Sequence, residues 1–267
     1  MADAIALYGR LIGARVRAQL QYRVSFALDV LGMVLVSFLD FVAVLLIFHA
    51  TPRLGNWTVE QVAFLYATSG VAFAIAELVV GHLDLFPQKI RDGSFDVLLV
   101  RPRGTLFQVI SEDFQLRRVG LALQSGAVLV WALAANDIDW TVGRAVMLAL
   151  MLGAGGVIFC SVWVFAICVV FWAVEGREAA SAFTYGGRAL TQYPVDVYGR
   201  WIRRLLAYLV PLAFVSYLPA LYVLGKDDPL GLPTWLRYSS PFAALAAAVA
   251  AGAMWRVAVR HYRSAGG

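Results

Sequence analysis

Long apolar stretches alternate with shorter polar ones along the whole chain. Six of the apolar stretches are long enough, and poor enough in charge, to cross a hydrocarbon core of roughly 30 Å. Their approximate limits are 25–49, 59–80, 119–135, 145–172, 205–223 and 241–259. We predict helices, because an open sheet edge cannot satisfy its backbone groups in lipid and no ten-residue alternation indicates a barrel. Pro211 and Pro219 predict a bend or break in the fifth helix.

The residues before the first span, 3–22, have helical periodicity. The apolar positions that share one helical face are Ile5, Tyr8, Ile12 and Val16. Arg10 and Arg17 fall on the opposite face. This pattern predicts an amphipathic helix lying in the membrane interface, with its arginines toward anionic lipid. A solvated helix packed on a neighbouring protein is the alternative.

The basic residues orient the spans. If both termini are cytoplasmic, 18 of the 22 lysines and arginines lie on the cytoplasmic side and four lie outside. Such an excess is typical of cytoplasmic segments. We therefore predict a single transmembrane domain over residues 1–267, with cytoplasmic loops at 82–118 and 173–204 and an extracellular loop at 224–240.

Composition agrees with a membrane protein. The chain is 61% hydrophobic, its mean hydropathy is +0.74, and 15% of its residues are charged, compared with about 25% in soluble domains. The net charge is +5, and the predicted membrane topology accounts for the distribution of the basic residues. We therefore expect membrane lipid and no nucleic acid as a partner.

Motifs of enzymatic chemistry are missing from the sequence. It has no Gly-x-x-x-x-Gly-Lys-Ser/Thr loop for phosphates, no His-Glu-x-x-His and no Gly-x-Ser-x-Gly. We expect no catalytic residue, no metal site and no cofactor in this chain.

Three carboxylates fall inside predicted spans. Asp29 and Asp40 are eleven residues apart on one face of the first span, and Glu77 lies in the inner half of the second. Charges in a membrane are costly and by default face a bundle interior or a water-filled cavity. These residues are candidates for a substrate path. The alternative is a structural ion pair, such as Asp29 with Arg117 or Arg118, whereas Asp40 has no basic residue at its depth in this interpretation.

The loop after the second span has its own pattern. Residues 84–91 predict a short helix, Asp92-Gly93 a turn, and Phe95 to Val100 an apolar run that Arg101-Pro102 ends. This rigid, basic loop could receive force from a motor subunit. The alternative is an ordinary loop whose lysine and arginines set the topology.

The same loop carries a resemblance to a known family. Lys-Ile-Arg-Asp-Gly-Ser-Phe-Asp-Val-Leu-Leu-Val-Arg-Pro (89–102) resembles a segment of type-2 ABC exporter permeases. Residues 193–203, 210–220 and 228–233 are similar to the branch in which two different permeases accompany one ATPase. Gly199 departs from the proline expected there.

The resemblance implies a permease with six spans, an interfacial helix and a cytoplasmic coupling helix in a bacterial inner membrane. It also implies a second permease and two ATPase subunits. The ATPase subunits would hold ATP and Mg²⁺. The implied ATPase-coupling residues are Phe86, Lys89, Ile90, Arg91, Asp92, Gly93, Phe95, Asp96, Arg101 and Pro102. We expect Phe86, Ile90 and Phe95 to fill a groove on the ATPase, inside a charged rim. A cation channel or secondary transporter that uses the intramembrane carboxylates is the alternative function.

Overall fold

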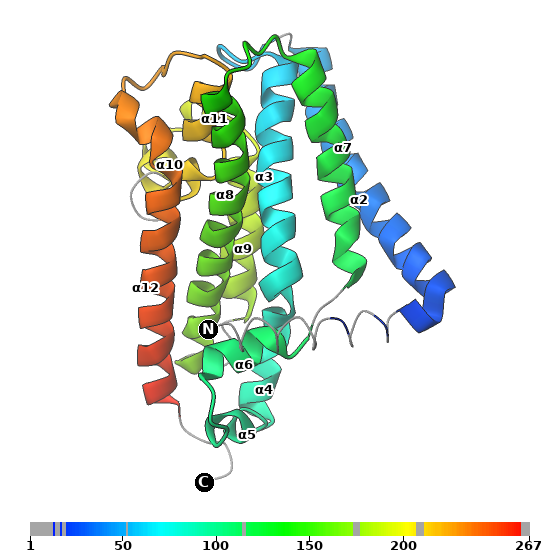
Figure 1. Ribbon diagram of the computed structural model, residues 1–267, viewed down its shortest axis with the longest axis vertical. Coiled ribbons are helices and arrows are strands. Elements are labelled where there is room, and N and C mark those ends of the chain that lie inside the picture. The colour runs from blue at the N-terminus through cyan, green and yellow to red at the C-terminus, as the bar shows by residue number, and fades with distance from the viewer. Residues whose placement is uncertain are drawn as a thin grey trace.

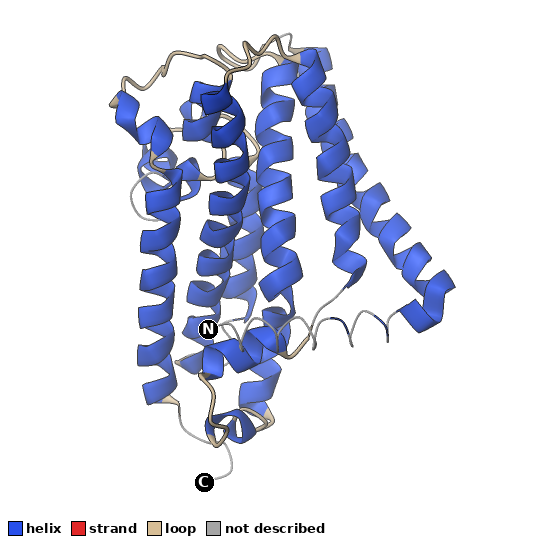
Figure 2. Cartoon of the chain, viewed as in Figure 1, coloured by secondary structure: helices blue, strands red, loops and turns tan. Residues whose placement is uncertain are grey.

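The computed structural model describes residues 13, 17, 20–51, 53–113, 116–172, 177–206 and 211–262, which form a bundle of helices (Figures 1 and 2). The described part of the chain contains no β-strand, and one isolated bridge pairs Leu54 with Trp57. The predicted all-α fold is confirmed. The predicted interfacial helix, residues 3–22, lies almost entirely outside the described residues.

The bundle is built from helices of very different lengths. The long ones are α2 (Arg23–Ala50), α3 (Val59–Val80), α7 (Val119–Ala135), α8 (Val142–Cys168), α9 (Arg177–Thr191) and α12 (Ser240–His261). The shorter ones are α4 (Phe86–Arg91), α5 (Asp96–Leu99), α6 (Thr105–Ser111), α10 (Arg200–Arg204) and α11 (Tyr217–Val223). Short 3-10 helices are η1 (Leu20–Tyr22), η2 (Gly81–Leu85), η3 (Leu116–Arg118), η4 (Val169–Phe171), η5 (Val195–Val197), η7 (Pro211–Phe214) and η8 (Thr234–Tyr238).

Helix α3 is the centre of the bundle and packs between α7 and α8 (Figure 1). It is apolar around its whole circumference and mostly buried, as expected of an interior helix. Small residues allow α8 to approach it closely. A β-carbon at Gly155 would lie 2.8 Å from Cβ of Ala72, and one at Gly156 would lie 2.9 Å from Cγ2 of Ile75. Glycines at such positions are typical of helix contacts inside membranes.

Five predicted spans correspond to helices of the structure. Four helical stretches, Arg23–Ala50, Val59–Arg91, Val142–Phe171 and Ser240–His261, are long and apolar enough to cross a membrane. Helix α7 is a shorter apolar helix whose limits equal those predicted. Helices α2 and α12 flank the bundle and expose most of their apolar side chains, which suits contact with lipid or another subunit.

The limits predicted for the fifth span, 205–223, are wrong. The described chain there consists of the two residues after α10, then η7 and α11. The predicted break is confirmed at Pro211, which begins η7, whereas Pro219 lies inside α11. Helix α9, which falls in a predicted loop, packs along α8 and α3 (Figure 1).

The prediction that the whole of 173–204 is a cytoplasmic loop is also wrong. The indole of Trp57, which lies just before α3, donates a hydrogen bond of 3.0 Å to Asp196. That end of α3 is opposite to α4 and α5 (Figure 1). Residues 195–204 and the loop at 82–118 therefore lie at opposite ends of the bundle, and both cannot be cytoplasmic. The excess of basic residues at the end formed by 82–118 is accordingly smaller than the one counted from the sequence.

The chain between α9 and α12 forms a cap over this opposite end. Lys226 donates to the Asn56 carbonyl oxygen at 2.7 Å and to Oε1 of Gln61 at 3.1 Å, so it ties the 224–240 loop to the start of α3. Partial burial lowers the pKa of Lys226 from its ordinary value, while the nearby Asp196 carboxylate opposes that shift.

Candidate functional site

Residues 86–104 fold as two short helices joined by the predicted tight turn. The Asp92 N–H donates to the Gln88 carbonyl oxygen at 2.8 Å where α4 ends. Gly93 follows with a φ of +67°, and its carbonyl oxygen accepts from the Asp96 N–H at 3.1 Å. A side chain at position 93 would be strained in this left-handed conformation, so the turn at Asp92-Gly93 is confirmed.

Three of the predicted ATPase contacts are buried inside this chain. Phe86, Ile90 and Phe95 are 1%, 7% and 0% exposed. The rings of Phe86 and Phe95 lie 5.3 Å apart, and both pack on Phe171 of η4 and Trp255 of α12. No surface is left for another subunit, so the predicted role of these side chains as groove-filling anchors is wrong. They fix the segment to the end of the bundle.

A different set of side chains is exposed on the segment. Val97 is 54% exposed, Val100 is 84% exposed, and Leu99 lies beside them. We propose that a partner subunit docks on this surface and call it the docking face; it comprises Val97, Leu99 and Val100 together with the exposed Arg91, Asp92, Arg101, Pro102 and Arg103.

Two charged residues from the predicted coupling set are partly buried. Lys89 forms a 2.6 Å ion pair with Glu112, just after α6, so its charge is directed toward the chain itself. Asp96 begins α5 and is half-buried. The docking face is consequently more apolar and more arginine-rich than the sequence alone indicated.

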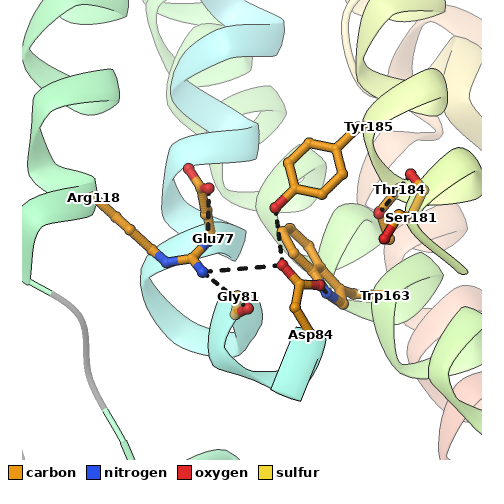
Figure 3. A network of polar contacts seen from close by, with 8 residues as sticks. All are labelled: Glu77, Gly81, Asp84, Arg118, Trp163, Ser181, Thr184 and Tyr185. Atoms are coloured by element: carbon orange, nitrogen blue, oxygen red, sulfur yellow. Dashed lines mark hydrogen bonds and ion pairs between the residues drawn. The ribbon is translucent and has the colours of Figure 1, made fainter. Parts of the chain in front are cut away.

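A buried polar network joins this segment to the bundle (Figure 3). Arg118 donates to Oε1 of Glu77 at 2.6 Å and to the Gly81 carbonyl oxygen at 3.1 Å, and its guanidinium lies 4.0 Å from Asp84. The side chains of Arg118 and Glu77 are only 10% and 5% exposed. A β-carbon at Gly81 would overlap the guanidinium, so the glycine that ends α3 makes room for this pair.

Asp84 extends the network to two further helices. Its carboxylate accepts hydrogen bonds of 2.9 Å from the indole of Trp163 on α8 and from the hydroxyl of Tyr185 on α9 (Figure 3). Asp84 lies two residues before Phe86, where the 86–104 segment begins. Asp84 thus links the start of the 86–104 segment to α8 and α9 through charge-assisted hydrogen bonds, which are stronger than neutral ones.

A second charged pair joins α2 and α9. Arg188 of α9 approaches Asp40 of α2 to 4.0 Å, and its guanidinium stands over the Phe73 ring at 5.2 Å. The hydroxyls of Ser69 on α3 and Thr191 on α9 are 2.6 Å apart. The expectation that Asp40 lacks a basic residue at its depth is wrong, because it depended on placing Arg188 in a loop.

The three predicted path carboxylates do not form one cluster. Glu77 is paired with Arg118, Asp40 is 55% exposed beside Arg188, and Asp29 is exposed on α2 with no ion pair among the described residues. Of the two predicted alternatives for Asp29, the pair with Arg118 is wrong, because Arg118 pairs with Glu77 and Asp84, and the side chain of Arg117 lies outside the described residues. Within the described ranges, no group of three or more His, Cys, Asp or Glu side chains could hold a metal ion.

Comparison with known proteins gives one match. A family model described as "ABC-2 family transporter protein" matches residues 34–266 of the chain. Neither the curated proteins nor the solved structures contain a match. The matched range includes the docking face, the polar network and the Asp40–Arg188 pair.

Proposed function

This chain belongs to the ABC-2 family of transporter proteins, and we propose that it is the permease subunit of an ATP-driven exporter. Two separate ATPase subunits would bind ATP and Mg²⁺ and would dock at the 86–104 end of the bundle. A second, different permease would complete the substrate path. The excess of basic residues at that end supports a cytoplasmic position for it and for both termini, in a bacterial inner membrane.

The docking face carries this proposal. Exposed apolar side chains grouped within a charged rim are typical of protein interfaces. The face also has a rigid support, since Phe86 and Phe95 anchor it from beneath and Asp84 links it to α8 and α9. A loop that served only to set topology would need neither feature.

Placing charges on the docking face is expected to abolish ATPase binding. The double substitution Val97→Asp/Val100→Asp should reduce co-purification of the ATPase subunit more than tenfold, because truncating central interface residues typically costs about 2 kcal/mol or more. Both positions are exposed, so the chain should accumulate normally. The measurement is pull-down of the ATPase from solubilised membranes.

A matched control is available at the other end of the molecule. Val142 is as exposed as Val100 and begins α8, where a carboxylate is favourable to the helix. Val142→Asp should leave the pull-down unchanged. Full ATPase binding by the double variant would rule out this surface as the docking site.

The Asp40–Arg188 pair is our candidate for the substrate path. A charged pair on the half-exposed side of a spanning helix is costly in lipid, so we infer that it faces the second permease and lines a polar route between the two. Nearby hydroxyls of Tyr66, Ser69 and Thr191 add hydrogen-bonding groups to this region.

Removing one charge of this pair is expected to impair transport without loss of the protein. Asp40→Asn should lower the transport rate roughly tenfold, and Asp40→Asn/Arg188→Gln should recover part of it, because contacting charges couple by about 0.5–3 kcal/mol. Transport into inverted vesicles and immunoblots of the membrane fraction provide the two readouts. Disappearance of Asp40→Asn from the membrane would instead identify a purely structural pair.

No observation favours the alternative of a cation relay. A relay needs carboxylates that exchange protons or ions in sequence. Glu77 and Asp40 each lie beside an arginine, and Asp29 is exposed on α2.

A further inference from the structure

A cavity of about 510 Å³ lies in the cap between α9 and α12. Most of its wall is apolar and comes from Phe214, Leu218, Leu230, Leu232 and Leu236, among others. Its size lies within the range of ligand sites, about 300–1,000 Å³. The cavity is distinct from the docking face, the polar network and the Asp40–Arg188 pair, since it shares no residue with them.

Three arginines of α10 also line this cavity. Arg200, Arg203 and Arg204 recur at spacings of three and four, so they share one helical face. Within the described ranges none of them forms an ion pair, and Nε of Arg203 is buried without a hydrogen-bond partner. Buried polar atoms are normally satisfied, so an unpaired guanidinium nitrogen beside a cavity indicates a missing acceptor.

The acidic side chains near the cavity are already engaged. Asp228 accepts from the Tyr217 hydroxyl and from the backbone N–H groups of Leu230 and Leu232. Asp196 accepts from the indole of Trp57. Neither carboxylate forms an ion pair with the α10 arginines among the described residues.

The surroundings of the cavity indicate the depth at which it lies. Trp201 and Trp235 adjoin the lining residues and are both exposed. Exposed tryptophans are enriched where lipid headgroups meet the hydrocarbon. An apolar cavity at this level, with arginines on one side, is complementary to an amphiphile that has an apolar chain at one end and an anionic group at the other.

We propose that this cavity binds an anionic phospholipid of the surrounding bilayer. One acyl chain lies against Phe214, Leu218 and the leucines of the 224–240 loop, and the phosphate accepts hydrogen bonds from the α10 arginines. The planar guanidinium group suits phosphate oxygens, to which it donates in pairs. A lipid without net negative charge leaves the positive face unneutralised and binds less tightly.

Native mass spectrometry of the full-length chain tests this site. The probes are phosphatidylglycerol and phosphatidylcholine with identical acyl chains. The wild-type protein should retain the anionic lipid at least about tenfold better, since arginines near an anionic lipid headgroup strengthen its binding. The double variant Arg200→Gln/Arg204→Gln, changed at two exposed positions, should lose that preference and keep its phosphatidylcholine binding.

Two further variants make the result decisive. Arg53 is exposed at the same end of the bundle and does not line the cavity, so Arg53→Gln should bind both lipids as the wild type does. Ala213→Phe, which fills the cavity from its wall, should weaken both. An unchanged preference in the double arginine variant, or an equal loss in Arg53→Gln, would overturn the proposal.

Discussion

Arg118→Leu is expected to remove most of the folded protein from the membrane. The substitution leaves the carboxylate of Glu77, 5% exposed, without its counter-charge in the interior of the bundle. Breaking a buried ion pair in this way costs about 3–5 kcal/mol, and the whole stability of a typical domain is about 5–15 kcal/mol. It also removes the hydrogen bond to the Gly81 carbonyl oxygen at the end of α3.

A double substitution separates the lost pair from lost packing. Glu77→Leu/Arg118→Leu removes both charges, and replacing a buried pair with apolar groups is often neutral or stabilising. The double variant should therefore be recovered at closer to the wild-type level than the single one. Fluorescence-detected size-exclusion chromatography after heating measures both. A single variant as heat-resistant as the wild type would show that the pair does not hold the bundle together.

Phe95→Ala should weaken both the chain and its attachment to the ATPase. Phe95 is fully buried and its ring contacts Phe86, Phe171, Trp255 and Tyr262. Truncating a core phenylalanine typically costs about 3–5 kcal/mol. The docking face follows directly in sequence, so it loses its support and the ATPase should co-purify poorly.

Comparing Phe95→Ala with Val100→Asp separates loss of support for the docking face from loss of direct contact with the ATPase. Phe95→Ala should lower the unfolding temperature and ATPase binding together, whereas Val100→Asp should lower binding alone. Phe95→Leu keeps most of the apolar volume and should be milder in both assays. If Phe95→Ala abolished binding with an unchanged unfolding temperature, the side chain would contact the partner after all, contrary to its burial.

The limits of individual spans were predictable where polar capping residues border an apolar run. Thr58 caps the start of α3: its hydroxyl accepts from the Gln61 N–H while the Gln61 side chain accepts from the Thr58 N–H. Helix α7 ends where the Asn136 side chain donates to the Ala132 carbonyl oxygen. The Gly93 turn was predictable because glycine tolerates positive φ.

Helix α9 could not be found by its apolar content. It carries Arg188 and several hydroxyl residues, and these are accommodated by Asp40 and Ser69 of neighbouring helices. Only the assembled bundle supplies those partners, so average hydropathy indicated a loop. Because α9 was assigned to a cytoplasmic loop, Arg200, Arg203 and Arg204 were predicted at the wrong end of the bundle.

The site was only partly predictable for a related reason. A sequence shows that Phe86, Phe95, Val97 and Val100 are apolar, but not which of them pack inward. Their division between buried support and docking face depends on Phe171 and Trp255, which come from distant helices. Likewise, Trp163 and Tyr185 carry no local signal of their contact with Asp84.

Cysteine cross-linking is the most direct test of the claim that residues 86–104 receive the ATPase. The background chain has Cys160 and Cys168 replaced by alanine, and single cysteines are introduced at Val100 and at Gly199, which are both exposed and lie at opposite ends. A short bifunctional reagent should join Val100→Cys to the ATPase subunit, whereas Gly199→Cys should form no such product and should react with an impermeant thiol reagent from outside the cell. An ATPase product from Gly199→Cys and none from Val100→Cys would contradict the account.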